Sequence, residues 1–62
     1  MRETFELKIF ERNDHFNKRK WFELTELKSG EVIFEHELQE RVLNYAEEFV
    51  KLRPGQYKLL KN

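Results

Sequence analysis

Residues 36–52, HELQERVLNYAEEFVKL, carry the clearest periodic pattern in the chain. When successive residues are placed about 100° apart, apolar side chains gather on one side and charged or amide side chains on the other, as in an amphipathic surface helix. The apolar side consists of Leu38, Val42, Tyr45, Ala46 and Phe49. The pattern predicts a helix over residues 37–52, with Phe49 at the centre of its contact with the rest of the protein.

The two ends of this predicted helix differ in how well they are marked. Pro54 disfavours helical geometry at the residue before it, and Gly55 permits a sharp reversal, so we expect the helix to stop near Leu52. The start lacks a Ser, Thr, Asp or Asn residue that could cap it. Glu37 and Arg41 lie four residues apart with the acid first, which predicts an ion pair on the helix surface.

The N-terminal part of the chain has the alternation of a half-buried strand. In residues 4–12, Phe5, Leu7 and Ile9 fall on one face and mostly polar side chains fall on the other. The turn-forming Asn and Asp side chains of residues 13–17 follow, which predicts a loop at the end of a hairpin.

Three more segments have strand character. Residues 21–27 alternate again, and after a turn signal at residues 28–31 the chain is rich in β-branched and aromatic side chains at residues 32–34. Residues 56–61 alternate weakly after the helix, which predicts one short last strand.

These elements predict an α+β fold in one domain, residues 1–62. The order is β-β-β-α-β: a small antiparallel β-meander with the amphipathic helix packed on one sheet face, because both surfaces have an apolar side to cover. The expected core between them is Phe5, Leu7, Ile9, Phe22, Leu24, Val32 or Ile33, Phe34, Leu38, Val42, Tyr45, Ala46, Phe49, Tyr57 and Leu59.

Composition narrows the class of protein. The 62 residues include no cysteine, so neither a disulfide nor a thiolate metal site is available to support the small core. No apolar run approaches the roughly 20 residues that span a bilayer, and the N-terminal residues do not resemble the apolar part of a signal peptide. We therefore expect a cytoplasmic protein that does not bind membranes.

The residues that carry enzymatic chemistry are scarce. His15 and His36 are far apart in sequence and lack the spacing of a metal-binding helix, and Ser29 has no nucleophile motif around it. With two glycines in the chain, there is no glycine-rich phosphate loop. The sequence predicts no metal, no cofactor and no enzymatic activity.

The stretch of residues 12–21 carries the sharpest functional signal, because it mixes cations with aromatic side chains. The residues predicted to contact a partner are Arg12, Phe16, Lys18, Arg19, Lys20 and Trp21. Phe10 joins Trp21 on the predicted outer face of the sheet, and aromatic residues beside arginine often dominate binding at protein interfaces. A protein with an acidic surface fits this stretch as the main expectation. Nucleic acid is the alternative, because such residues also hold phosphates and stack bases, although a formal net charge of zero gives no general attraction to it.

The helix offers a second surface. Leu43 and Val50 lie at the margin of its apolar side and widen it beyond what one sheet face is expected to cover. Self-association into a homodimer through these residues, or through an open sheet edge, is a third expectation.

Residues 18–60, KRKWFELTELKSGEVIFEHELQERVLNYAEEFVKLRPGQYKLL, resemble the small inhibitors of bacterial RNA polymerase that short-tailed phages encode. The shared features are an aromatic-rich strand, the Ala46-Glu47 pair within an acidic helix, and the Pro54-Gly55 reversal before Tyr57. This chain departs from that family by adding an N-terminal strand, and no contact residue carries over. The resemblance implies a phage protein in the host cytoplasm that modulates transcription or related nucleic-acid metabolism by occupying the surface of a host protein.

Overall fold

The structure is a computed structural model, and it describes residues 3–61. Its elements are β1 (Phe5–Asp14), β2 (Arg19–Glu26), β3 (Val32–His36), α1 (Gln39–Lys51) and β4 (Tyr57–Leu59). The predicted α+β fold and its element order are confirmed. Within the described residues, no helix has the length and apolar character needed to cross a bilayer.

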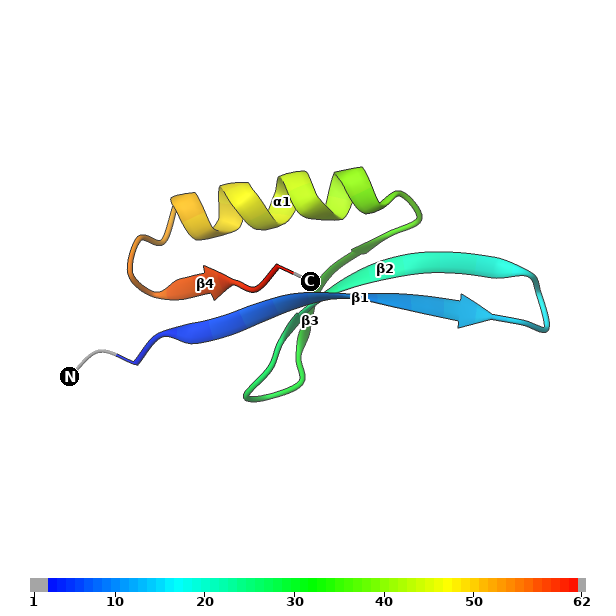
Figure 1. The fold of residues 1–62 in the computed structure, drawn as a ribbon, viewed down its shortest axis with the longest axis horizontal. Coiled ribbons are helices and arrows are strands. Elements are labelled where there is room, and N and C mark those ends of the chain that lie inside the picture. Colours follow the sequence, from blue (N-terminus) through cyan, green and yellow to red (C-terminus); the bar gives the residue numbers. More distant parts are fainter. Residues whose placement is uncertain (1–2, 62) are drawn as a thin grey trace.

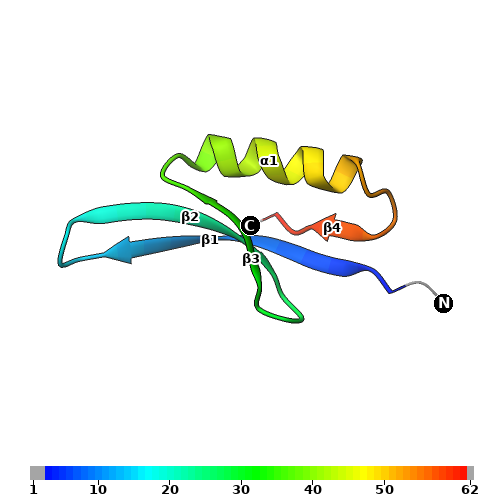
Figure 2. The same ribbon diagram turned by 180° about the vertical axis from the view of Figure 1, so that it is seen from behind.

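The four strands form one sheet in the order β3-β2-β1-β4, with α1 lying along one face of it (Figures 1 and 2). β1, β2 and β3 pair antiparallel, as predicted for the meander, but β4 pairs parallel to β1, so the sheet is mixed. The direction of β4 follows from the helix. Because α1 carries the chain back across the sheet, β4 starts at the end where β3 starts and runs the same way.

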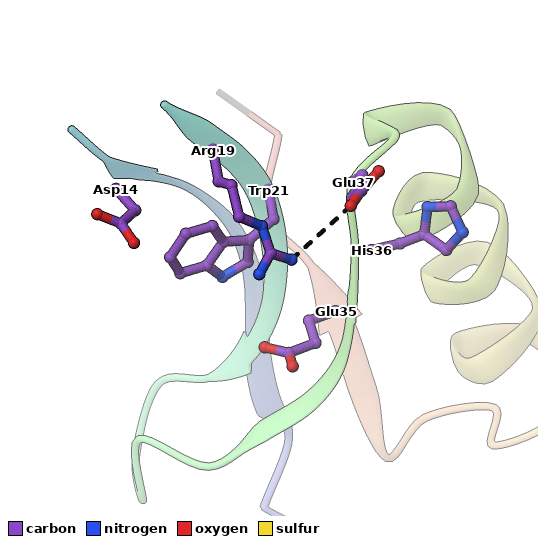
Figure 3. A pocket seen from close by; sticks show the side chains of 6 residues that line it. All are labelled: Asp14, Arg19, Trp21, Glu35, His36 and Glu37. Carbon is purple, nitrogen blue, oxygen red and sulfur yellow. Dashed lines mark ion pairs between the residues drawn. The ribbon is translucent and has the colours of Figure 1, made fainter. Parts of the chain in front are cut away.

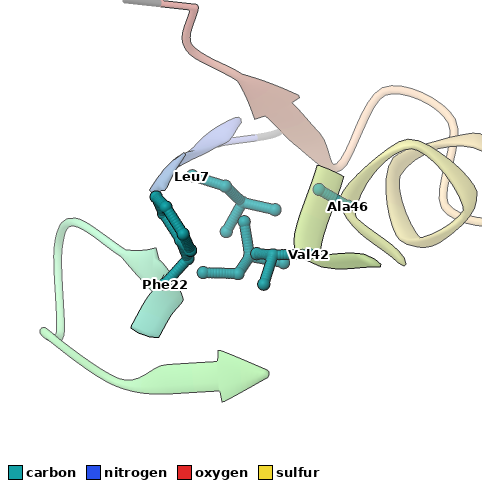
Figure 4. Close-up of a cluster of buried hydrophobic side chains, with 5 residues drawn as sticks. Leu7, Phe22, Val42 and Ala46 are labelled. Carbon is teal, nitrogen blue, oxygen red and sulfur yellow. The ribbon is translucent and has the colours of Figure 1, made fainter. Parts of the chain in front are cut away.

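The core lies between α1 and the two central strands. Five apolar side chains are buried: Leu7, Phe22, Leu24, Val42 and Ala46 (Figure 4). Around them lie half-buried side chains that complete the contact: Ile9, Ile33, Phe34, Phe49, Val50, Tyr57 and Leu59. The predicted core is therefore largely confirmed, but its centre is at Val42 and Ala46, one to two turns before Phe49.

Two predicted core residues, Leu38 and Tyr45, are exposed, and of the alternatives Val32 and Ile33 it is Ile33 that packs against the core. Leu38 is 57% exposed because it is the N-cap of α1 and has extended geometry. Val32 begins β3 beside a bulge between Leu24 and Thr25, and its side chain is exposed. Tyr45 lies at the margin of the helix, where one face of its ring stacks on Phe34 with centroids 4.2 Å apart.

The helix begins two residues later than predicted. The backbone N–H of Leu38 donates to Nδ1 of His36 at 3.0 Å, and no side chain caps the helix from the N-cap position. Glu37 thus lies outside the helix, and the predicted pair with Arg41 is wrong, because Glu37 pairs with Arg19 of β2 instead. The predicted end is confirmed: Leu52 is the C-cap, and Gly55 has a φ of 79° in the reversal that follows.

Candidate functional site

The far end of the β1–β2 hairpin projects beyond the rest of the fold. β3 ends at His36, opposite Phe22, so the strand residues among 12–21 pair only with each other within the part of the chain that the structure describes. The ten residues of β1 span about 34 Å, whereas the 13 residues of α1 span about 20 Å. The hairpin therefore extends past the helix and gives the molecule dimensions of 45 × 21 × 18 Å (Figure 1).

The tip of this hairpin is a turn held by one carboxylate. Asp14 accepts hydrogen bonds from the backbone N–H of Phe16 at 3.1 Å and of Asn17 at 3.3 Å, and from Nδ2 of Asn17 at 2.9 Å. The hydrogen bonds from Asn17, its side chain first, hold the pKa of Asp14 below its ordinary value. Lys18 closes the turn with a φ of 53°, in the left-handed region.

Phe16 stands at this tip with 98% of its surface exposed. Its ring lies away from the hydrophobic core, because the hairpin extends beyond the helix and the other strands. The Asp14 turn orders the backbone around it, so little conformational freedom of that backbone remains to be lost on binding. An exposed aromatic ring on an ordered backbone turn is well suited to enter an apolar pocket of a partner.

Three of the four hairpin cations already have a carboxylate partner within the chain. Nε of Arg12 lies 2.9 Å from Oε1 of Glu23, and Nζ of Lys20 lies 2.6 Å from Oε1 of Glu11. Nη2 of Arg19 lies 3.7 Å from Oε1 of Glu37. Lys18 has no ion pair within the described residues.

The strand register separates the predicted partner-binding residues into three groups. Arg12, Arg19 and Trp21 lie on the outer face of the sheet, which α1 leaves uncovered. Lys20 lies on the opposite face, where its Nζ is 5.7 Å from the ring centroid of Phe22. Phe16 and Lys18 belong to the turn. The structure therefore does not bring all six side chains to one surface.

The outer face carries a connected set of aromatic and charged side chains. Glu23 accepts from Nε of Arg12 and, at 3.1 Å, from Nε1 of Trp21, and these hydrogen bonds, that of Arg12 first, lower the pKa of Glu23. The Arg12 guanidinium also lies 5.3 Å from the ring centroid of Phe10. Phe10 and Trp21 thus lie on the outer face as predicted, fixed by the charged pair between them.

A shallow pocket of about 510 Å³ lies between the far end of the hairpin and the end of β3 (Figure 3). It is lined by Asp14, Arg19, Trp21, Glu35, His36 and Glu37. Arg19 reaches across it from β2 to Glu37, while the His36 ring is turned toward the helix (Figure 3). Asp14 and His36, which also line the pocket, accept hydrogen bonds from backbone N–H groups, so they serve the local structure.

Two other sequence-based expectations concern metals and self-association. Among residues 3–61, no three His, Cys, Asp or Glu side chains gather as a metal site would require. Leu43 is 37% exposed on the side of α1, whereas Val50 packs against the protein's own core.

Sequence reasoning missed the carboxylates that pair with the hairpin cations. Glu23 and Glu11 approach Arg12 and Lys20 because of the cross-strand register, and Glu37 had been placed in the helix. The opposite charges on the two strands were the available signal. No family model, curated protein or solved structure matches the chain.

Proposed function

We propose that this chain is a non-enzymatic interaction module that binds a partner protein through the projecting hairpin, with Phe16 as its anchor. The observation that carries the proposal is the 98% exposure of Phe16 on a turn that Asp14 holds in place. Leaving a large apolar ring in water on an ordered tip has a cost that binding would recover, since burial of such a ring in a partner's pocket is favourable.

The charge arrangement supports a protein partner over nucleic acid. Binding to phosphates gains free energy when cations release the counterions of the nucleic acid. Arg12, Arg19 and Lys20 are each engaged with a glutamate, so phosphates would have to compete with carboxylates for them. Lys18 and the Phe16 ring fit instead an apolar pocket that has an acidic group at its rim.

The resemblance to phage inhibitors of bacterial RNA polymerase suggests where such a partner is found. We place it among host proteins of nucleic-acid metabolism, with transcription as the first candidate, and this part of the proposal rests on the resemblance alone. A small chain that occupies the surface of a host enzyme needs no cofactor of its own.

A site-specific crosslink tests the anchor directly. Phe16 is replaced by the photoreactive benzoylphenylalanine, and the matched control carries the same residue at Leu52, which is 72% exposed at the other end of the molecule. In nuclease-treated lysate of the host cells, we expect a protein that crosslinks from position 16 and not from position 52. Equal crosslinking from both positions would contradict the proposal.

The affinity for the crosslinked protein, once purified, gives the second readout. Phe16→Ala should weaken binding by about 2 kcal/mol, roughly 30-fold in Kd, because it removes an aromatic anchor. Leu52→Ala should bind like the wild type. Retention of full affinity by Phe16→Ala would show that the ring is not the anchor.

Binding of the wild-type protein to nucleic acid separates the two partner classes. Single-stranded and duplex DNA and RNA are titrated at low salt, where phosphate contacts are strongest. We expect no binding. Tight binding that weakens steeply with added salt, and that is lost when Lys18, Arg19 and Lys20 are replaced together, would establish nucleic acid as the partner instead.

A further inference from the structure

We propose that the free edge of β1 at residues 9–13 is a strand-addition site for an extended segment of a partner protein in which apolar and acidic residues alternate. This edge lies on the β4 side of the sheet and ends at Asn13, just before the hairpin turn. The inference does not depend on Phe16, and a failure of either proposal leaves the other standing.

The backbone hydrogen bonds identify which groups of β1 face this edge. The carbonyl of Glu6 accepts from the N–H of Leu27, so even-numbered residues of β1 face β2. The carbonyl of Leu7 accepts from the N–H of Leu60 at 2.8 Å, so odd-numbered residues face β4.

β4 covers only the first part of that edge. It pairs with Phe5, Glu6 and Leu7, whereas β1 continues to Asp14. Beyond Leu7, the N–H and C=O groups of Ile9, Glu11 and Asn13 therefore face an edge that no strand of the described residues occupies. Such a row of unpaired backbone groups is a template for an added strand.

The opposite edge of the sheet is less suited to this role. β3 has five residues, and its pairing with β2 contains a bulge between Leu24 and Thr25. Short strands and bulges are among the features that keep an edge from pairing with other chains. The register between β1 and β2 has no such irregularity.

A groove beside the free edge supplies specificity on the helix side. It has a volume of about 290 Å³. Its apolar lining is Ile9, Leu43, Leu59 and Leu60, and Gln39, Glu47 and Lys61 complete its wall. In an added strand, every second side chain would point toward this side of the sheet. An apolar side chain there would fill the groove and cover the exposed surface of Leu43.

The outer side of the same edge carries two cations, Lys8 and Arg12, of which Arg12 is already paired with Glu23. Nζ of Lys8 lies 5.4 Å and the Arg12 guanidinium 5.3 Å from the ring centroid of Phe10, so the two cations share one aromatic neighbour. Lys8 has no ion pair in the described part of the chain. The alternate side chains of an added strand would lie beside these cations, which favours Asp or Glu at those positions.

A second copy of the chain fits this edge poorly. Antiparallel pairing of two such edges about a twofold axis centred on Glu11 would set Glu11 opposite its own copy and Ile9 opposite Asn13. Like charges directly opposite each other destabilise a sheet. The occupant is therefore a segment of a different protein.

The probe is a blocked eight-residue peptide in which Val and Glu alternate, compared with one in which Val and Lys alternate. Two-dimensional NMR of the labelled protein should show shifts and slowed amide exchange at Ile9, Glu11 and Asn13 when the Val-Glu peptide binds. We expect this peptide to bind at least about tenfold more tightly than the Val-Lys peptide, because Lys8 attracts glutamate and repels lysine. Equal binding of both peptides, or shifts confined to other parts of the protein, would overturn the proposal.

Glu11→Pro tests the backbone contribution. Proline removes the N–H that faces the free edge and leaves the β1–β2 hydrogen bonds intact, as proline on an edge strand can. Glu35→Pro is the matched control: Glu35 lies between Phe34 and His36, which face β2, so its own N–H faces the other free edge. Glu11→Pro should weaken binding of the Val-Glu peptide about tenfold, and Glu35→Pro should weaken it by less than about twofold. An equal loss in both would contradict the assignment.

A second pair of variants decides the question if Glu11→Pro does not fold. Leu43→Glu replaces an apolar side chain of the groove by a second glutamate beside Glu47 and changes no strand residue. Leu52→Glu is its exposed control at the end of the helix. Weaker peptide binding by Leu43→Glu alone supports the site. Unchanged binding by Leu43→Glu, or a dimer of the free protein that the peptide dissociates, overturns the proposed occupant.

Discussion

Two carboxylates organise turns of the sheet. Asp14 holds the turn between β1 and β2, and Glu26 holds the one between β2 and β3 by accepting from the N–H of Lys28 at 2.8 Å and of Ser29 at 2.7 Å, and from Oγ of Ser29 at 2.5 Å. The hydrogen bond from the Ser29 side chain is the largest cause of a pKa for Glu26 below its ordinary value of 4.5. The charged form of Glu26 is therefore the form that the fold stabilises.

Replacement of Glu26 should make the protein less sensitive to acid. Because the pKa of Glu26 is lower in the folded state, its contribution to stability is present above pH 4.5 and is lost as the pH falls through the folded pKa. Glu26→Gln should lower the free energy of unfolding at pH 7 and reduce its decline on acidification, measured by urea unfolding across this range. Glu48→Gln, at an exposed helix position, is the control and should decline like the wild type. If the free energy of unfolding of Glu26→Gln declined on acidification as steeply as that of the wild type, Glu26 would not have this role.

A buried hydroxyl offers a second test at the scale of one residue. Oγ1 of Thr25 is buried and has no hydrogen-bond partner in the described structure. Thr25→Val keeps the shape and removes the unpaired group, so it should raise the free energy of unfolding by about 1 kcal/mol. Thermal unfolding followed by circular dichroism measures this, and a lower melting temperature would show that the hydroxyl has a partner.

At the scale of elements, a row of aromatic rings fastens α1 to the strands. Tyr45 stacks on Phe34 of β3, and Phe49 meets Tyr57 of β4 edge-on with centroids 4.8 Å apart. The ring of Tyr57 in turn packs beside that of Phe5 in β1, with centroids 5.8 Å apart. The helix is thus attached to both edges of the sheet, as well as to the buried side chains at its centre.

Phe49 is the ring on which this attachment can be tested. It is half-buried, and the Arg53 guanidinium covers it at 4.0 Å from the ring centroid. Phe49→Ala should cost about 3 kcal/mol of unfolding free energy, the low end for a Phe-to-Ala change, because the site is not fully enclosed. Leu52→Ala, three residues further on and exposed, should change stability by less than about 0.5 kcal/mol. An unchanged melting temperature for Phe49→Ala would refute this attachment.

At the scale of the whole molecule, the fold has two layers and a thin core. One helix covers one face of the sheet, and five apolar side chains are buried between them (Figures 1 and 4). Within the described residues, no second layer covers the opposite face of the sheet, the projecting hairpin or the β1 edge. Of the residues predicted to self-associate, Leu43 is exposed and Val50 is half-buried against the core.

We expect the free protein to be a monomer. Val50 already packs part of its surface against the protein's own core, and Glu11 disfavours pairing of two β1 edges. Sedimentation equilibrium from micromolar to near-millimolar concentration should give the chain mass of 7.7 kDa. A dimer mass that Leu43→Glu converts to a monomer mass would instead support the homodimer predicted from the sequence.

Local patterns in the sequence determined which elements form. The spacing of Leu38, Val42, Ala46 and Phe49 encodes a helix, and the alternation of Leu7 and Ile9 encodes a strand with one buried face, because each repeat matches the geometry of its own segment. Pro54 and Gly55 likewise mark the end of the helix through their own backbone preferences. The exposed loop with Phe16 could be found in the same way.

The tertiary structure alone decided which segments became neighbours. The parallel pairing of β4 with β1, the ion pairs of Arg12, Arg19 and Lys20, and the uncovered edge at Ile9 all depend on register and direction between segments distant in sequence. An alternating pattern specifies the face on which a side chain lies, but it does not specify the strand beside it. For that reason the sequence predicted a hairpin with free positive charges. In the folded protein most of these charges are paired with carboxylates, and the apolar side chain of Phe16 at the tip is exposed.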